Sequence, residues 1–396
     1  MKIALIADTF PPLRNSGPVQ LRDLSREFVA QGHELTVILP SWEIKEDFLL
    51  EDMEGFQVLR LKSPKTKDVN YARRTLSEFL MPFFMKEGYK KSPLRDEKWD
   101  GIAWYAPSIF HAPFVNDLKK ASDCKGYLII RDIFPEWAVD MGLMGRGPIY
   151  RFFSAVARYQ YSVADIIGVQ TPGNIAYFED WKKGKGKKLV VLQNWLADTK
   201  PGSCSISINR TTLVGRKIFV YAGNMGVAQG MDILIDLAEK LKDRRDIGFL
   251  FVGRGSEAKR LAEESRRRSL DNMEFKDEIH PDEIPALYEQ CFAGIVSLDQ
   301  RHKSHNIPGK FLSYMQSGIP VLANINPGND LAEIIRSEGV GVACESADIL
   351  DLERKANALI NSVETDADFQ KRCRAVYEKM FSPSQAVRQI VRELER

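Results

Sequence analysis

The chain has few cysteines and no excess of charge of either sign. Its five cysteines in 396 residues are odd in number and far apart: Cys124, Cys204, Cys291, Cys344 and Cys373. This spacing excludes a disulfide framework and a paired CxxC metal site, and it favours a reducing compartment. Lys and Arg total 56 against 54 Asp and Glu, a net charge of +2. Because the charge is so evenly balanced, we expect no nucleic acid as the main ligand.

Long apolar runs are also missing. No stretch is long and apolar enough to span a bilayer. The chain starts with Met1-Lys2, the short apolar run 3–7 and Asp8, so it lacks the longer apolar region and the cleavage site of a signal peptide. We therefore expect a cytoplasmic protein.

The apolar runs that are present have the length and order of buried strands. The run 2–7 is followed by a loop, by helical periodicity over 21–31 and by a second apolar run, 35–39. Strands without polar alternation are typical of a parallel sheet covered on both faces. The same rhythm continues over 102–105, 127–130, 166–170 and 189–192, and it restarts over 218–222, 248–252, 273–275, 294–297 and 321–323.

The restart predicts two domains, which fits the length of the chain. We expect an α/β protein of two Rossmann-like, doubly wound parallel-sheet domains, over 1–200 and 201–380, and a last helix over 381–396. The segment 199–216, with Pro201-Gly202-Ser203, reads as a linker.

Two loops lie where open α/β sheets bind ligands, after the first strand of each half. The first, Thr9 to Pro18, contains Gly17, which would let a substrate approach the backbone. The second, Gly223-Asn224-Met225-Gly226, could present amides to a diphosphate. Ala228 stands where the third glycine of a dinucleotide fingerprint would be, which disfavours a dehydrogenase.

A basic segment, 301–310, leads into a predicted helix over 311–317. Lys310 beside a helix N-terminus predicts an anion site, because the charge and the helix dipole act together. The alternative is a solvated basic loop. The segment follows the strand 294–298 and faces the same side as the Gly223 loop, which favours the anion site.

Several motifs, spread over nearly the whole chain, resemble the family-four retaining glycosyltransferases of GT-B fold. They are Phe10-Pro11-Pro12, Gly32-His33-Glu34, Gly253-Arg254-Gly255, Pro308-Gly309-Lys310 and Ser317-Gly318-Ile319-Pro320-Val321. Three further stretches, 131–137, Gln193-Asn194-Trp195 and 221–226, are similar to the bacterial surface-polysaccharide branch that includes N-acetyl-L-fucosamine transferases.

The resemblance implies two facing domains, a last helix that crosses back to the first domain, and a set of site residues. The catalytic residues would be Arg131, Asp132, Lys310 and Arg254. The donor-binding residues would be Ser16, Gly17, Gly223, Asn224, Gly226, Gln229, Ile279, His305, Ile307, Pro308, Gly309 and Ser313. His111 and Glu136 would lie on the acceptor side.

The chain departs from the family pattern at several of these positions. His305 and Ser313 stand where many members carry two glutamates, and Asn224 and Gln229 replace a phosphate-binding Arg and Lys. Lys310 and Arg254 are then the cations left for the diphosphate. Arg131 replaces a histidine; a structural ion pair with Asp132 or Glu136 is the alternative role.

The resemblance implies a reaction without a protein nucleophile. The acceptor hydroxyl attacks from the face of the departing diphosphate, whose oxygen takes the proton, so positioning and electrostatics supply the catalysis. We expect no cofactor and no metal; the one Asp-x-Asp, Asp366-Ala367-Asp368, reads as solvated surface. The donor would be a UDP-sugar, with an N-acetylated amino sugar such as L-FucNAc, and the acceptor a lipid-linked saccharide of O-antigen or capsule synthesis.

Two stretches of the first half mix bulky apolar residues with cations, over 71–91 and 146–161. Such helices can lie on an anionic membrane surface, which would place the protein peripherally at the inner face of the cell membrane. They could equally be core helices with a basic outer face. Two other functions also stay open: a nucleotide-sugar 2-epimerase, which would need carboxylates in the site, and a sugar-binding or scaffold protein without activity.

Overall fold

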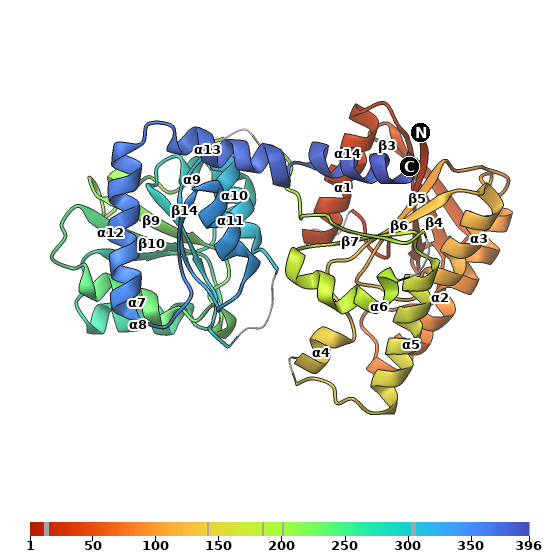
Figure 1. The fold of residues 1–396 in the computed structure, drawn as a ribbon, viewed down its shortest axis with the longest axis horizontal. Helices are drawn as coiled ribbons and strands as arrows, with labels where there is room; N and C mark the ends of the chain where they lie inside the picture. Colours follow the sequence, from red (N-terminus) through yellow and green to blue (C-terminus); the bar gives the residue numbers. More distant parts are fainter. Residues whose placement is uncertain (12–15, 141, 184–185, 200–201, 302–305, 396) are drawn as a thin grey trace. The chain divides into compact units, whose positions relative to one another are not determined.

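The computed structural model describes residues 1–396 except 12–15, 141, 184–185, 200–201, 302–305 and 396. The chain forms two compact units. The first comprises Met1–Trp195 and Pro383–Arg396, and the second Leu196–Ser382. Each unit is an α/β layer structure around a largely parallel sheet (Figure 1), so the expected α/β class with two parallel-sheet domains is confirmed.

The first unit is built on an eight-stranded sheet of order β3-β4-β2-β1-β5-β6-β7-β8. The strands are β1 (Lys2–Ile6), β2 (Glu34–Ser41), β3 (Phe48–Met53), β4 (Phe56–Lys62), β5 (Gly101–Tyr105), β6 (Lys125–Ile129), β7 (Ile166–Val169) and β8 (Lys188–Val191). The helices are α1 (Ser16–Ala30), α2 (Tyr71–Lys91), α3 (Ala112–Ser122), α4 (Glu136–Asp140), α5 (Pro148–Val163), α6 (Glu179–Lys182) and α14 (Pro383–Glu395), with a 3-10 segment over Pro172–Phe178.

Both faces of this sheet are covered. Alternate residues of β1 enter two separate cores: Ala4 and Ile6 lie in the core beneath α2, α3 and α5, and Ile3 and Leu5 lie in the core beneath α1 and α14. That double cover explains why the strand is apolar throughout. The hairpin β3–β4 is antiparallel, so this edge of the sheet differs from the parallel arrangement that the sequence predicted. Its turn, Glu54-Gly55, has positive φ at both positions, as two-residue hairpins require.

The last helix belongs to the first unit. Val387 and Ile390 of α14 are fully buried in the core shared with α1. Leu394 lies so close to Gly101 of β5 that a Cβ there would be 2.8 Å from its Cδ1, and Gln389 Nε2 donates to the carbonyl of Val191 at 2.6 Å. The helix therefore closes one face of the eight-stranded sheet.

The second unit has a six-stranded parallel sheet of order β11-β10-β9-β12-β13-β14. The strands are β9 (Lys217–Ala222), β10 (Ile247–Val252), β11 (Met273–Lys276), β12 (Ala293–Ser297), β13 (Val321–Asn324) and β14 (Gly341–Cys344). The helices are α7 (Asp232–Lys240), α8 (Ala258–Arg267), α9 (Ile284–Tyr288), α10 (Gly309–Ser317), α11 (Asp330–Glu338), α12 (Ile349–Thr365) and α13 (Phe369–Val376). Shorter 3-10 turns span Ile208–Arg210, Val227–Gln229 and Pro281–Glu283, and a π turn spans Tyr377–Phe381.

The segment expected to be a linker, 199–216, is largely part of this second unit. Ile206, Ile208 and Leu213 are buried in its core. The compact units divide at Trp195 and at Ser382, where the sequence suggested 200 and 380. The Pro, Gly and Ser content misled the prediction because three apolar side chains among those residues anchor the segment.

Candidate functional site

Lys310 is the side chain around which the second unit builds its candidate site. It lies in the first turn of α10, where the amides of Gly309 and Lys310 have no acceptor within the helix, whereas the Phe311 amide donates to the Pro308 carbonyl at 3.0 Å. The hydroxyl of Tyr314 fixes this helix to the sheet, because it donates to the carbonyls of Val220 at 3.2 Å and Ile295 at 3.0 Å. The Lys310 ammonium lies over the ring of Tyr221, 4.5 Å from its centroid.

The positive charge of Lys310 has no opposite charge beside it among the described residues. Burial lowers the pKa of Lys310 from 10.5 to about 8. Within the described part of the chain, no carboxylate pairs with it. The N-terminus of α10 adds its partial positive charge. A lysine that is desolvated and unpaired beside helix amides is arranged to receive an anion.

Gly223 makes room for the Lys310 side chain. A Cβ at this position would be 3.1 Å from Nζ, and its φ of 135° also excludes ordinary side chains. The loop after β9 also packs on the loop after β10: a Cβ at Gly253 would lie 2.1 Å from the Gly223 carbonyl oxygen, and one at Gly255 would lie 2.2 Å from that of Met225. Glycine at these positions therefore lets the two loops pack against each other, in addition to any room that it leaves for a ligand.

The Gly223–Gly226 loop does not offer all the amides that the sequence suggested. The Gly223 amide donates to Val252 O at 2.8 Å, and the Met225 amide to Arg254 O at 2.7 Å. The Gly226 amide donates to the side-chain oxygen of Gln229 at 2.9 Å, and Asn224 Nδ2 is 3.3 Å from the same oxygen. These three amides are therefore committed within the protein, which corrects the expectation that they would hold a diphosphate. Lys310 and the first amides of α10 are the donors that remain close together.

The other predicted residues of the second unit differ in how they are held. Arg254 is 81% exposed and pairs with Glu278 at 3.0 Å, so it is less firmly placed than Lys310. Ile307 is buried and Ile279 packs partly against the core. Gly309 is exposed at the start of α10, after Pro308, and the Ser313 hydroxyl donates to the Gly309 carbonyl at 3.4 Å. His305 lies outside the described residues.

Arg131, in the first unit, is a buried structural contact. Its guanidinium donates to the carbonyls of Leu192 at 2.9 Å and Gln193 at 3.5 Å, and it lies over the ring of Trp195 at 4.5 Å. Trp195 is itself fixed by a bond of 2.7 Å from Nε1 to the Gln20 carbonyl. The alternative role foreseen from the sequence was an ion pair with Asp132 or Glu136. Among the described residues Arg131 forms no such ion pair, and its hydrogen bonds go to the two backbone carbonyls. The motifs at 131 and 193–195 are thus one packed unit.

The remaining candidates of the first unit are not equally accessible. His111 is fully buried at the start of α3, and burial lowers its pKa to about 4, so its ring is neutral at physiological pH. Asp132 is exposed, whereas Glu136 is half-buried, with its pKa raised by burial, and accepts a bond of 3.4 Å from the Tyr150 hydroxyl. A Cβ at Gly17 would have Thr9 at 3.6 Å as its nearest described neighbour, so the protein leaves space there, and the approach of a substrate to this glycine stays a prediction. The side chain of Ser16 lies outside the described part.

The Asp-x-Asp motif connects α12 and α13. Asp366 pairs with Arg372 at 2.7 Å and Asp368 with Lys371 at 2.9 Å. Among the residues that the structure describes, no group of three His, Cys, Asp or Glu side chains could hold a metal ion.

Sequence reasoning missed Tyr221, which forms the aromatic surface under Lys310. The sequence placed it in a buried strand and in the motif 221–226, but gave it no role in the site. Its position near the end of β9, directly before the Gly223 loop, could have indicated this role, because a large ring there can pack against a residue of a neighbouring loop.

Comparisons with known proteins agree with this fold. Residues 216–362 match the model of a family described as glycosyl transferases group 1. The chain is 23% identical over 365 residues to WcaI of Escherichia coli K12, named as a colanic acid biosynthesis glycosyl transferase; the match covers 87% of this chain and 88% of the relative. It is 24% identical over 242 residues to WbjE of Pseudomonas aeruginosa, named as a glycosyltransferase, with 60% of each chain covered.

Solved structures share the architecture over the full chain. The Anabaena protein HepE, in complex with UDP, matches with a TM-score of 0.69 at 15% identity, covering 100% of both chains. WaaG, described as a glycosyltransferase involved in lipopolysaccharide biosynthesis, matches with a TM-score of 0.59 at 14% identity, covering 98% of this chain and 99% of WaaG. At such identities the likeness shows the fold.

Proposed function

We propose that this chain is a group 1 glycosyltransferase, similar to the surface-polysaccharide enzymes that it resembles in sequence, and that it transfers a sugar from a UDP-sugar to a lipid-linked saccharide. The observation that carries the donor site is Lys310: a partly buried cation without a carboxylate partner among the described residues, at the N-terminus of α10, over Tyr221 and beside Gly223. This arrangement is suited to a diphosphate, and one structural neighbour, HepE, is described in complexes with UDP, with UDP and glucose, and with UDP-glucose.

The proposed reaction is retaining and needs no cofactor. Lys310 and the first amides of α10 stabilise the charge that develops on the leaving diphosphate as the bond to the sugar breaks. An oxygen of the departing phosphate takes the proton of the attacking acceptor hydroxyl. Arg254 would add a second cation once it leaves Glu278. Because of the resemblance of the motifs, we propose that the transferred sugar is an N-acetylated amino sugar such as L-FucNAc and that the pathway is O-antigen or capsule synthesis.

A lipid-linked acceptor has to be met at a membrane, and α2 offers a surface for it. Met81 and Met85 on one side of this helix are buried. On the other side Leu76, Phe79, Leu80, Phe83 and Phe84 are exposed, and Phe152 of α5 lies 6.2 Å from Phe79. We call these six residues the aromatic face. A core helix with a basic outer face would expose mainly charged side chains, whereas the outer face of α2 exposes apolar ones.

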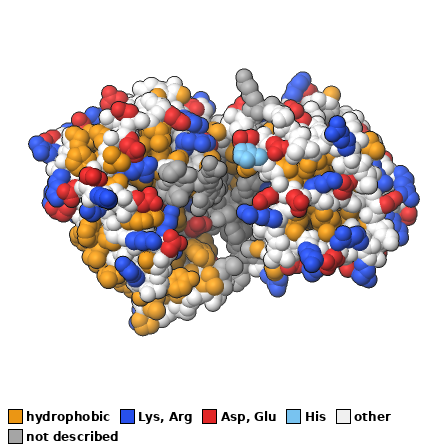
Figure 2. Space-filling view, turned by 180° about the vertical axis from the view of Figure 1, so that it is seen from behind, with side chains coloured by type: hydrophobic (Ala, Val, Ile, Leu, Met, Phe, Trp, Pro, Cys, Tyr) orange, Lys and Arg blue, Asp and Glu red, His pale blue; other side chains and the backbone are white. Residues whose placement is uncertain are grey.

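Charge around the aromatic face suits an anionic bilayer. The sequence of α2 carries five Lys and Arg against two Glu, with Arg74, Lys86, Lys90 and Lys91 in ion pairs, and that of α5 carries two Arg and no acid. Figure 2 shows hydrophobic side chains gathered on the lower left, on the first unit. Within the described residues no helix has the length and apolar character needed to cross a membrane. We therefore propose peripheral attachment to the inner face of the cell membrane through the first unit.

The function is tested with nucleotide sugars. A thermal-shift panel of UDP, GDP and their sugars should show stabilisation by the UDP series, since a ligand that binds only the native state raises its apparent stability. Incubation with the stabilising UDP-sugar and membrane lipid extract should release UDP and retain the anomeric configuration in the product. Conversion of the donor to its epimer without transfer would instead indicate an epimerase, and binding without turnover would indicate a sugar-binding protein; either result rejects the proposal.

A further inference from the structure

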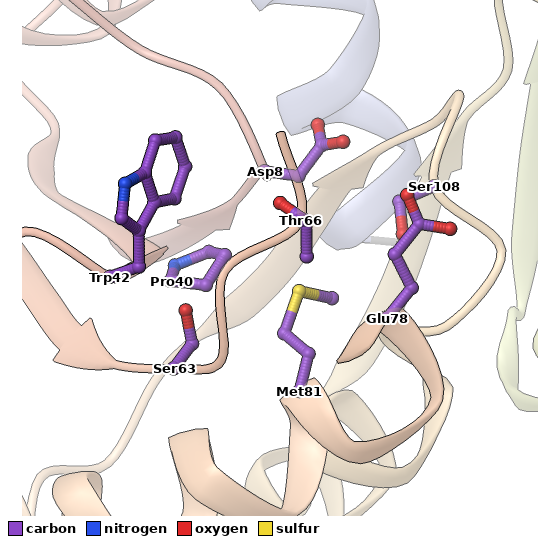
Figure 3. A pocket seen from close by; sticks show the side chains of 8 residues that line it. All are labelled: Asp8, Pro40, Trp42, Ser63, Thr66, Glu78, Met81 and Ser108. Atoms are coloured by element: carbon purple, nitrogen blue, oxygen red, sulfur yellow. The ribbon is translucent and has the colours of Figure 1, made fainter. Parts of the chain in front are cut away.

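The first unit has a pocket at the point where its strand order reverses. β1 pairs with β2 on one side and with β5 on the other, so the chain builds the sheet outwards in both directions from β1. Open α/β sheets bind ligands at the carboxyl ends of the strands beside this point. The pocket, a cavity of about 20 Å³ that opens to solvent, lies there; Asp8 follows β1, Trp42 follows β2 and Ser108 follows β5 (Figure 3).

Asp8 lacks a partner in this pocket. Its Oδ1 atom is buried, and no hydrogen bond to it is formed by the described residues. The pKa of Asp8 is raised to about 6, mainly by burial and to a smaller extent by the nearby Glu78 carboxylate, while a backbone hydrogen bond and the charges of Lys67 and Arg74 oppose the rise. Folding leaves such an oxygen without the hydrogen bonds that water gives it in the unfolded chain, which disfavours the folded state. A ligand that donates a hydrogen bond to Oδ1 would remove this cost.

The rest of the lining has the chemistry of a sugar site. Glu78, from α2, supplies a second carboxylate at the other side of the pocket from Trp42 (Figure 3). Ser63, Thr66 and Ser108 supply hydroxyl groups. The Trp42 indole is half-buried, with the Lys67 ammonium 5.7 Å from its ring centroid. Sugar hydroxyls donate to carboxylates, and the C–H face of a pyranose packs on an aromatic ring, so the three kinds of group serve one ligand.

We infer that this pocket is a saccharide subsite in which Asp8 and Glu78 accept hydrogen bonds from the hydroxyls of one sugar ring packed against Trp42. The inference rests on the proposed function, because a transferase needs a saccharide acceptor, and it names side chains that select one ring of that acceptor. The subsite is formed entirely by the first unit, whereas Lys310 and the diphosphate site belong to the second.

Two methionines allow both sites to be observed in the same full-length protein. Met81 lines the pocket, and Met225 lies in the Gly223–Gly226 loop of the second unit. Protein with ¹³C-labelled methionine methyl groups is titrated with methyl glycosides of hexoses, deoxyhexoses and N-acetylhexosamines, and separately with UDP. We expect at least one class of glycoside to shift the Met81 signal saturably, and UDP to shift the Met225 signal.

The variants Asp8→Asn and Trp42→Ala should each weaken the glycoside-dependent shift of Met81 by about tenfold in apparent Kd, the effect of losing one bond to a charged group or the stacking surface. Glu87→Gln is the control, because Glu87 is an exposed acid on the same helix that pairs with Lys90 at 2.7 Å. In all variants UDP should shift Met225 as in the unaltered protein.

The outcomes separate the two proposals. The subsite is rejected if no glycoside moves the Met81 signal, or if Asp8→Asn binds as tightly as the control; a rise in melting temperature in that variant without any glycoside binding would mark Asp8 as a strained structural residue. If UDP fails to move the Met225 signal, the donor site is in error, whatever happens at Met81.

Discussion

Lys310 combines a cost in stability with a proposed gain in binding, and one substitution should reveal both. Its pKa is lowered by burial from 10.5 to about 8. Lys310→Met keeps the length of the side chain and removes the charge. We expect UDP to bind more weakly by about 1–3 kcal/mol, because a charge-assisted contact to phosphate is lost. The variant should at the same time be more stable at pH 7, by up to about 3 kcal/mol for the shift in pKa.

Calorimetry with UDP and denaturant unfolding measure the two effects. The structural alternative, a solvated basic loop, predicts neither change. Weaker UDP binding together with lower stability would show that Met disturbs the packing on Tyr221, and it would remove the argument for a desolvated cation.

The pH dependence of UDP binding follows from the same lysine. Its folded pKa lies below its unfolded pKa, so the cost of its charge is fully present below pH 8 and disappears as the pH rises from about 8 towards 10.5. A bound diphosphate favours the ammonium and raises the pKa again. UDP affinity should therefore be level below pH 8 and fall above it, with uptake of up to one proton on binding near pH 9.

Titration calorimetry in buffers of different ionisation enthalpy measures that proton. Lys310→Met should bind UDP with no such uptake and with a flatter profile. An equal proton uptake in the variant would assign the linkage to another group.

Arg131 gives a prediction that separates a structural role from a catalytic one. Removal of the guanidinium leaves the carbonyls of Leu192 and Gln193 without their donor and removes the contact on Trp195. Arg131→Met should lower the free energy of unfolding of the first unit by about 2–3 kcal/mol. Asp132→Asn, at an exposed neighbour, should change it by less than about 0.5 kcal/mol. Full stability with loss of turnover in Arg131→Met would restore the catalytic assignment.

The sequence placed Lys310 correctly at the start of a helix, because charge, helix start and strand position coincide in a short segment, whereas its role in binding an anion stays a prediction. It was a poor guide to Arg131, since the Leu192 and Gln193 carbonyls that bind it are some 60 positions away and have no side-chain signature. The amides of Gly223 and Gly226 also looked available, because a glycine pattern does not say that Val252 and Gln229 already accept from them. Asp8 went unmarked, as burial and the lack of a partner are properties of the folded chain.

At the scale of elements, uninterrupted apolar runs were reliable indicators of the parallel strands, since both faces of each sheet are covered. The hairpin β3–β4 was missed because its residues mix charge with apolar side chains at the edge of the sheet. The role of 206–213 in the second core was also missed, since three separated apolar residues have no period. The Pro, Gly and Ser content of the segment 199–216 therefore predicted its place in the fold less well than its three buried apolar side chains would have done.

The helix α14 is an element whose importance can be measured with one residue. Ile390 is fully buried between the sheet of the first unit and α1. Ile390→Ala should lower the free energy of unfolding by about 2–5 kcal/mol, from lost transfer energy and the cavity left behind. Arg388→Ala, on the exposed side of the same helix, is the matched control and should change little. Equal melting temperatures for both variants would mean that α14 does not hold the first unit together.

At the scale of the whole molecule, the net charge of +2 hides an uneven distribution. Ion pairs neutralise many cations of the second unit, including the four-residue cluster of Arg268 with Asp236, Glu239 and Glu264. In the first unit, Arg151 and Arg158 lie on a helix without acidic residues, beside the aromatic face. Balanced composition is thus compatible with one surface that attracts an anionic bilayer.

That surface is tested by sedimentation with vesicles of phosphatidylglycerol and phosphatidylethanolamine, with phosphatidylcholine vesicles as the comparison. Each cation near an anionic surface contributes about 1 kcal/mol, so binding should be weak and should fall as salt rises. Phe83→Ser with Phe84→Ser should release the protein by removing the apolar contact. Replacement of Arg146, Arg151 and Arg158 by Glu should release it by reversing the charge.

Both sets of substitutions lie in exposed side chains of the first unit, so UDP binding by the second unit should persist and serves as the control for folding. The two sets also distinguish the kinds of contact. If only the arginine variant is released, the attachment is electrostatic and the exposed phenylalanines have another use. If the unaltered protein stays in the supernatant with anionic vesicles at low salt, the aromatic face does not bind membrane, and the meeting with a lipid-linked acceptor needs a different surface.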